Sequence, residues 1–299
     1  MTWYFWALLS MISGAFEEVI DKVIIIKNPQ KIDALVASFY RNFGFFFFTI
    51  LAGILGIFGK MTFSFNIYLL ILALVWPLHS LAYDYFLRNI ELSRFQGILY
   101  AFPILFLFVD KIYFHINYSI LQVIGVVLLV CGALIFSFDS QQKKTVFSLK
   151  GIIGILIHAT TYAYLLIAFK FTENSINEIS FYFSAWLLVI IFYAILILIT
   201  GKYKYLKETA ITEGFLKRTF VSKGSDFLSS IFYLKALALA TLTTVSAFSS
   251  FSPIILLIIL LLLARFTKIN SAENFSPQAL YYKIAATGIL ALGGYLIFI

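Results

Sequence analysis

The sequence predicts an all-α polytopic membrane protein with ten transmembrane helices, arranged as two inverted five-helix repeats. Three observations lead to this expectation. Hydrophobic residues make up 62% of the 299 residues and charged residues only 12%, whereas a soluble globular domain has about 45–50% apolar and about 25% charged residues. The apolar residues form long continuous runs, and one helical span of a bilayer takes about 20 such residues. Finally, several positions of the first half recur in the second half at one constant offset.

Ten apolar runs define the expected helices. Their ranges are 3–24, 34–58, 65–87, 94–112, 119–138, 149–171, 178–200, 218–240, 243–264 and 278–298. A transmembrane barrel would instead show shorter segments of strict alternation. The first run begins with Trp3, Tyr4 and Trp6 and lacks a basic n-region and a small-residue cleavage site, which predicts a retained span with an interfacial aromatic anchor.

The internal repeat rests on three pairs of residues at an offset of 150 positions. The pairs are Tyr83 and Tyr233, Leu87 and Leu237, and Pro103 and Pro253. Each set predicts a helix, a tight connection and a helix broken by proline. We expect residues 1–145 to form the first repeat and 146–299 the second, within one integral membrane domain. Because five spans is an odd number, the second copy is expected to be inverted across the membrane.

The repeat region resembles a known family. The stretch from Ala82 to Gly132, with Tyr83, Pro103, Gln122, Gly125 and Gly132, is similar to the repeat of the drug/metabolite transporter superfamily (EamA-like transporters). A second copy runs from Tyr233 through Pro253 to Gly288. The resemblance implies a central cavity, walled mainly by spans 1, 3, 4, 6, 8 and 9, that moves a small organic solute. Where the family repeats carry a glutamate at the end of spans four and nine, this chain has Asp110 and Arg265, so a shared role is not expected there in the second half.

The basic residues indicate an orientation. Of the 22 Lys and Arg residues, 18 fall at odd-numbered connections, and the others are Lys60, Lys111, Lys170 and Lys235. Since basic loops stay in the cytoplasm, this pattern predicts that both termini lie outside, whereas the resemblance implies that both lie inside. The net charge of +8 then reflects topology and contact with anionic headgroups, and no nucleic-acid partner is expected.

The first expected helix carries the densest group of ionisable residues. One polar stripe at helical spacing consists of Ser10, Gly14, Glu17 and Asp21. Ionisable groups in hydrocarbon are costly, so they are functional candidates. Glu17 and Asp21 are like charges one turn apart, and their repulsion favours a bound proton on one of them. Glu17 is therefore the candidate for binding a proton or cation, with Glu18 beside it. The alternative is that this segment lies at the end of the helix and is in contact with water.

The third and sixth expected helices each carry a polar face. Trp76, His79 and Tyr83 fall at positions i, i+3 and i+7, so they share one side of a helix. His158 and Tyr162 lie near the middle of the sixth helix. These five residues are candidate substrate-binding residues, and the alternative for each histidine is a hydrogen bond to a neighbouring helix.

Further candidates lie in the remaining helices. The eighth helix presents Asp226, Ser229 or Ser230, and Tyr233 at similar spacing, with Lys223 placed to neutralise Asp226. The fourth and ninth helices contribute Tyr100 and Ser249, and Gly14, Pro103 and Pro253 are expected packing or hinge positions. We expect Arg41 to extend toward the headgroups, Asp84 to pair with Arg88, and the run Phe45 to Phe48 to face lipid.

These features favour a secondary active transporter of a small organic metabolite, working by alternating access, with proton coupling as an option. Aromatic groups around carboxylates suit an amine or cationic amphiphile, and an amino acid is the competing substrate class. The alternative function is a membrane channel or a solute receptor without active transport. No nucleophile, metal or phosphate-loop motif is visible and Cys131 is alone, so we expect no enzyme activity, cofactor or metal. The expected partners are the small-molecule substrate and the lipids of the cell (inner or plasma) membrane, with the protein a monomer or homodimer.

Overall fold

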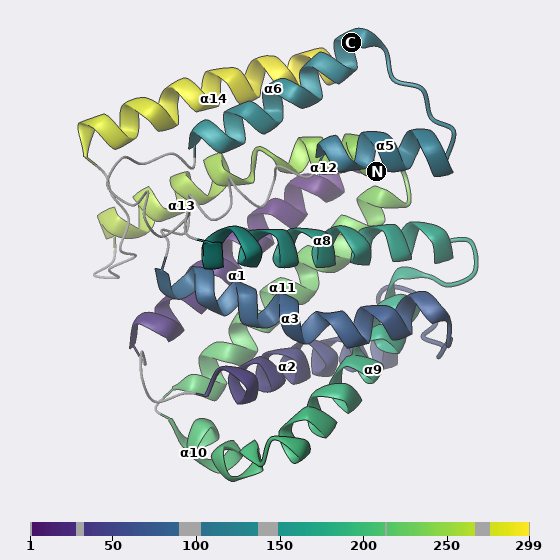
Figure 1. Cartoon of the computed structure of the whole chain (residues 1–299), viewed down its shortest axis with the longest axis vertical. Helices are drawn as coiled ribbons and strands as arrows, with labels where there is room; N and C mark the ends of the chain where they lie inside the picture. Colours follow the sequence, from purple (N-terminus) through teal and green to yellow (C-terminus); the bar gives the residue numbers. More distant parts are fainter. Residues whose placement is uncertain are drawn as a thin grey trace.

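The computed structural model of the chain is a bundle of α-helices (Figure 1). It describes residues 2–27, 33–89, 103–136, 149–212, 214–266 and 276–298. Within these ranges the chain forms helices and short connections and no strand. The predicted all-α class is therefore confirmed.

The helices follow the predicted ranges closely. The first half contains α1 (Trp3–Lys27), α2 (Ala34–Leu55), α3 (Ile67–Asn89), α5 (Pro103–Tyr113) and α6 (Ile120–Phe136). The second half contains α8 (Leu149–Thr172), α9 (Glu178–Ile199), the 3₁₀ helix η1 (Lys202–Lys204), α10 (Tyr205–Ile211), α11 (Phe215–Leu237), α12 (Leu242–Ser249), α13 (Ser252–Phe266) and α14 (Pro277–Phe298). The predicted range 94–112 is described only from Pro103, and the short segment of η1 and α10 was not predicted.

Two helix boundaries differ from the prediction for local reasons. α2 ends at Leu55 because Gly56 takes a left-handed conformation, with φ of 64°, and its N–H bonds to the carbonyls of the preceding turn. The predicted ninth helix is divided into α12 and α13, and the division falls just before Pro253. Proline lacks the N–H that a continuous helix needs there, so the predicted break at this position is confirmed.

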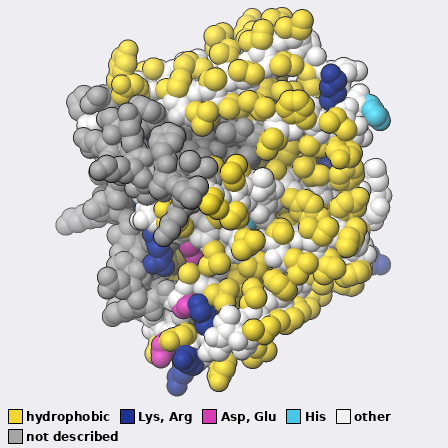
Figure 2. Space-filling view, viewed as in Figure 1, with side chains coloured by type: hydrophobic (Ala, Val, Ile, Leu, Met, Phe, Trp, Pro, Cys, Tyr) yellow, Lys and Arg dark blue, Asp and Glu magenta, His cyan; other side chains and the backbone are white. Residues whose placement is uncertain are grey.

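The outer surface is suited to lipid. Within the described residues, six helices are long and apolar enough to cross a membrane: Ala34–Leu55, Ile67–Asn89, Ile153–Thr172, Glu178–Ile199, Leu242–Leu263 and Leu280–Ile297. Large apolar side chains are exposed around the bundle, among them Ile120 at 79%, Ile199 at 78% and Ile284 at 70%. Figure 2 shows apolar side chains over most of the described part of one face. Exposed apolar surface on this scale marks an integral membrane protein.

The bundle has a central group of six helices and a peripheral pair. In the centre, α1 packs along α11, α3 packs along α8, and α2 packs against α9 and α11. The pair α6 and α14 lies at the top of the view in Figure 1. Gly125 and Gly293 bring these two helices together, since a Cβ on either glycine would lie 2.8 Å from the backbone oxygen of the other.

Each of these pairings joins a helix of residues 1–145 to a helix of residues 146–299. The helices of the two halves therefore interleave in one body. The expected boundary between the repeats falls within residues 137–148, which lie outside the described residues.

Candidate functional site

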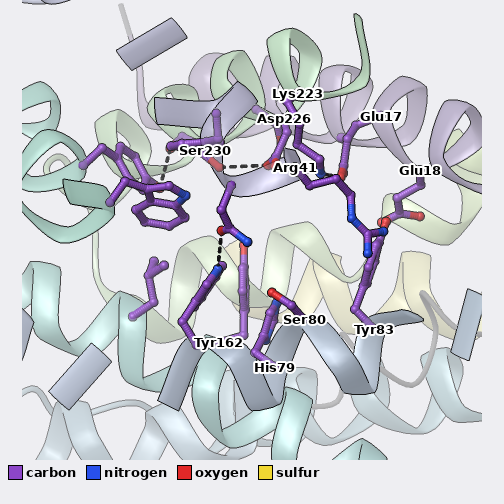
Figure 3. Close-up of a pocket in the computed structure, with 18 of the residues that line it drawn as sticks. Glu17, Glu18, Arg41, His79, Ser80, Tyr83, Tyr162, Lys223, Asp226 and Ser230 are labelled. Carbon is purple, nitrogen blue, oxygen red and sulfur yellow. Dashed lines mark hydrogen bonds and ion pairs between the residues drawn. The ribbon is translucent and has the colours of Figure 1, made fainter. Parts of the chain in front are cut away.

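A cavity lies in the middle of the central six helices. It holds about 1030 Å³ of empty space, counting its open mouth. Its lining residues are Gly14, Glu17 and Glu18 of α1, Arg41, Asn42 and Phe45 of α2, Trp76, His79, Ser80 and Tyr83 of α3, His158, Tyr162 and Leu165 of α8, Tyr182 and Trp186 of α9, and Lys223, Asp226, Ser229 and Ser230 of α11. Figure 3 shows Glu17, Lys223 and Asp226 on one side and Tyr162, His79 and Ser80 on the other.

The walls differ from those that the family resemblance implies. In the described part of the chain, α2 and α9 line the cavity, whereas α5, α12 and α13 contribute no lining residue. The cavity is thus formed by the first three helices of each predicted half. This differs from the walls that the resemblance implies for spans 4 and 9, although residues 94–102 of the predicted fourth span lie outside the described residues.

One lysine joins three carboxylates at the cavity wall. The Nζ atom of Lys223 lies 2.6 Å from a Glu17 oxygen, 3.3 Å from an Asp21 oxygen and 3.0 Å from an Asp226 oxygen. Asp21 also accepts a hydrogen bond of 2.5 Å from the Ser222 hydroxyl. The predicted neutralisation of Asp226 by Lys223 is confirmed. The polar stripe of α1 is also real, and it faces α11 because Lys223 can satisfy its acids there.

A second ion pair holds α2 against α3. The guanidinium of Arg41 pairs with the carboxylate of Asp84, and the side chains are 11% and 4% exposed. The Ser38 hydroxyl lies 3.4 Å from both groups. The expectation that Arg41 extends to the headgroups is therefore wrong, because a buried carboxylate on the next helix offers a stronger partner than the membrane surface.

Aromatic rings and imidazoles form another part of the wall. The ring centroids of Trp76 and His79 are 4.3 Å apart, those of His79 and His158 are 3.9 Å apart, and those of Tyr83 and His158 are 5.8 Å apart, with 18° between the planes in each pair. The Nδ1 atom of His79 lies 3.3 Å from the backbone oxygen of His158. Trp76 donates a 2.8 Å hydrogen bond to the side-chain oxygen of Asn42. The wall is thus a stack of nearly parallel rings built from α3 and α8.

Small residues allow α1 and α11 to approach closely at the cavity. The Ser229 hydroxyl donates a 2.9 Å hydrogen bond to the Ser10 carbonyl and lies 3.3 Å from the Ser10 hydroxyl. A Cβ on Gly14 would lie 3.0 Å from the Ser229 oxygen. The predicted role of Gly14 as a close-approach position is therefore consistent with the packing.

Most of the predicted site residues meet at this cavity. Those that line it are Gly14, Glu17, Glu18, Trp76, His79, Tyr83, His158, Tyr162, Asp226 and Ser229. Two others are not among its lining residues: Tyr233 packs edge-on against Tyr162, and Ser249 bonds to the Val245 carbonyl within α12. Tyr100 lies outside the described residues. Pro103 begins α5, and Pro253 is in the first turn of α13, so both stand at helix starts.

The sequence interpretation missed several lining residues. Asn42, Ser80, Tyr182 and Trp186 were not identified. Phe45, which was assigned to the lipid face with its neighbours, is 1% exposed and stacks on Trp186 at 4.5 Å. A run of phenylalanines does not show which of its members face lipid and which face the core. Asn42, one turn from Ser38 in an apolar helix, does indicate the side that faces the protein interior.

The carboxylate of Asp110 has a separate structural role. One of its oxygens accepts hydrogen bonds from the Tyr118 hydroxyl at 2.7 Å and from the Thr243 backbone N–H at 2.9 Å. It therefore caps the N-terminus of α12, where the helix dipole favours a negative charge. Burial raises the pKa of Tyr118 to about 12, so its phenol keeps the proton that it donates.

Comparisons with known proteins establish the fold and no family. No protein-family model matches the sequence, and no curated protein matches it. A solved structure described as "Crystal structure of protein" superposes with a TM-score of 0.65 at 13% identity, covering 97% of this chain and 97% of its own. At this identity the likeness extends to the fold alone: an experimentally determined chain of nearly the same length has the same helical arrangement.

Proposed function

We propose that the protein is a secondary active transporter that moves a small organic metabolite across the cell (inner or plasma) membrane by alternating access. In this proposal ten spans form two inverted five-helix repeats, as in the EamA-like transporters that the sequence resembles. The observation that carries the proposal is a charged cavity enclosed by helices of both halves, within a bundle whose outer surface is apolar. Substrate sites of secondary transporters lie at such repeat interfaces.

The pattern of helix contacts supports an inverted repeat. In the proposed repeat, α1, α2 and α3 of the first half are equivalent to α8, α9 and α11 of the second half. Exchanging the two halves then turns the packing of α1 on α11 into the packing of α8 on α3. The packing of α2 on α11 likewise corresponds to that of α9 on α3, and all four contacts occur. The pairs α2–α9 and α6–α14 correspond to themselves, as expected of helices that meet on a twofold axis. The helices run roughly from left to right in Figure 1, and the marked N- and C-termini both lie in its right-hand half, as an even number of spans requires.

A pair of matching lysine contacts supports the same repeat. Lys22, near the end of α1, donates a 2.5 Å hydrogen bond to the Leu87 carbonyl near the end of α3. Lys170, near the end of α8, donates a 2.9 Å hydrogen bond to the Leu237 carbonyl at the end of α11. Leu87 and Leu237 are one of the residue pairs at the offset of 150 positions. The repeated leucine therefore coincides with a repeated contact.

The helix crossings at the cavity correspond as well. Lys22 and Lys170 are 148 positions apart, and the same offset relates Ser10 to His158. The contact of Ser10 with Ser229 on one side is then matched by the contact of His158 with His79 on the other. The two halves thus present equivalent positions with different chemistry.

This difference makes the two ends of the cavity unlike. The positions that match Glu17 and Asp21 in α8 are Leu165 and Phe169, and the position that matches Lys223 in α3 is Ala73. In the proposed transporter, ion pairs between α1 and α11 close one end, and apolar side chains between α8 and α3 close the other. Alternating access would open the first end by separating Glu17 from Lys223 and the second by parting an apolar contact.

The proposal is tested by uptake into proteoliposomes containing the purified protein. A panel of radiolabelled tyramine, tyrosine and glucose, with and without a pH gradient, should show saturable uptake of tyramine or tyrosine above empty liposomes. Uptake that rises linearly with concentration would indicate a channel. A panel member that binds the protein in detergent but is not taken up would indicate a receptor.

A further inference from the structure

The group around Lys223 carries more negative than positive charge. One ammonium lies within 3.3 Å of carboxylate oxygens of Glu17, Asp21 and Asp226. The nearby guanidinium of Arg41 is already paired with Asp84. With all three carboxylates ionised, two negative charges would be in excess in this cluster, at a place where uncompensated charge is costly and a bound proton or a second cation is favoured. A second positive charge in the cavity would lower that cost.

We infer that the Lys223 ammonium occupies the place of a cargo ammonium, and that the cargo is an aromatic amine cation. The inference rests on the proposed transport function and narrows its substrate to one chemical class. Lys223 is fixed to α11, beside Asp226, and reaches across to Glu17 on α1. An amine that enters from the cavity meets the same two oxygens, since both acids also line it. The lysine and the cargo therefore compete for one position.

The charge arrangement disfavours a carboxylate-bearing cargo. The carboxylate of an amino acid would need a cation in the cavity that has no partner. Among the described lining residues the two cations are Arg41 and Lys223, and both are held by acids. A zwitterion would thus add a carboxylate to a cluster in which three acids already share one lysine, and a simple amine adds none.

The neighbouring wall suits a flat ring. The stacked rings of Trp76, His79 and His158 line the cavity, as does Phe45 on α2. Aromatic faces attract both other rings and cations. A cargo with an ammonium one short chain away from an aromatic ring would place each group against a matching surface.

Equilibrium dialysis with three probes of the same ring tests the inference on the full chain in detergent. The probes are tyramine, tyrosine and 3-(4-hydroxyphenyl)propionate, which are a cation, a zwitterion and an anion. We expect tyramine to bind at least tenfold more tightly than the other two. Lys223→Met, which removes the internal competitor, should tighten tyramine binding at least tenfold. Lys235→Met is the matched control, because Lys235 lies on the same helix, pairs with Glu178 and does not line the cavity, and it should leave binding within twofold.

A second variant keeps the test decisive if Lys223→Met does not fold. Glu17→Gln leaves Lys223 with two acids and should weaken tyramine binding at least tenfold. Tighter binding of tyrosine or the propionate by the wild type, or unchanged tyramine binding in Glu17→Gln, would overturn the inference, as would unchanged or weaker binding in folded Lys223→Met. If tyramine binds as expected but does not enter proteoliposomes, the transport function fails while cation recognition stands. If tyrosine enters and tyramine does not bind, transport stands and the cation inference fails.

Discussion

The buried pair of Arg41 and Asp84 allows a quantitative prediction. Arg41→Met leaves the carboxylate of Asp84, which is 4% exposed, with the Ser38 hydroxyl at 3.4 Å. Removing one partner of a buried ion pair costs about 3–5 kcal/mol, because the remaining charge is desolvated and unpaired. Asp84→Leu should cost a similar amount for the same reason.

The double variant Arg41→Met/Asp84→Leu allows the interaction energy between the two side chains to be measured separately from their interactions with the rest of the protein. Replacing both charges by apolar side chains of similar volume is often nearly neutral, so we expect the double variant to lose at most about 1 kcal/mol. The difference gives a coupling energy of about 5 kcal/mol or more between the two residues. The free energy of unfolding is measured by equilibrium SDS titration of the purified protein in mixed micelles.

A more exposed ion pair provides the control. Lys202 and Asp33 are 2.7 Å apart, but their side chains are 34% and 22% exposed. Lys202→Met should therefore cost less than about 1 kcal/mol. Additive losses in the double variant, or a loss for Lys202→Met as large as for Arg41→Met, would refute the claim that burial of the charges sets their energetic weight.

Three other outcomes are expected. Gly125→Ala places a Cβ 2.8 Å from the Gly293 carbonyl oxygen, so thermal unfolding should show that the protein loses about 1–3 kcal/mol of stability from overpacking. Gly288→Ala, whose Cβ meets nothing within 4 Å, should unfold like the wild type. Equal losses of stability in the two variants would contradict this packing. Glu17→Gln should abolish the response of uptake to a pH gradient, because the amide cannot take up a proton; an unchanged pH-driven flux would exclude Glu17 as the proton-handling group. A cysteine at position 204, in place of the lysine of η1, should resist an impermeant thiol reagent outside intact cells, and labelling there would reverse the charge-based orientation.

Sequence periodicity predicted which residues share a helix face, and it did so well at this site. Glu17 and Asp21 on α1, and Trp76, His79 and Tyr83 on α3, were identified because spacing within one helix fixes their common side. Ionisable residues in apolar helices are also rare enough to stand out. Helical spacing and the rarity of ionisable residues in apolar helices therefore identify many of the cavity-lining residues from the sequence alone.

Spacing could not predict which helices meet. The partner of Arg41 lies on α3, and two of the three acid partners of Lys223, Glu17 and Asp21, lie on α1. These contacts depend on packing between segments far apart in the chain. The role of Phe45 was lost for a related reason. In a membrane protein an apolar side chain suits both lipid and core, and only the position of α9 shows that Phe45 packs on Trp186.

Counterflow in proteoliposomes is the most direct test of alternating access through this cavity. Vesicles loaded with unlabelled tyramine are diluted into labelled tyramine, and the same is done with tyrosine in place of tyramine. We predict that at least one labelled solute accumulates transiently above its equilibrium level, because a carrier that returns loaded exchanges the two pools. Labelled solute that enters at the same rate with and without the internal pool, and never exceeds equilibrium, would contradict the proposed mechanism.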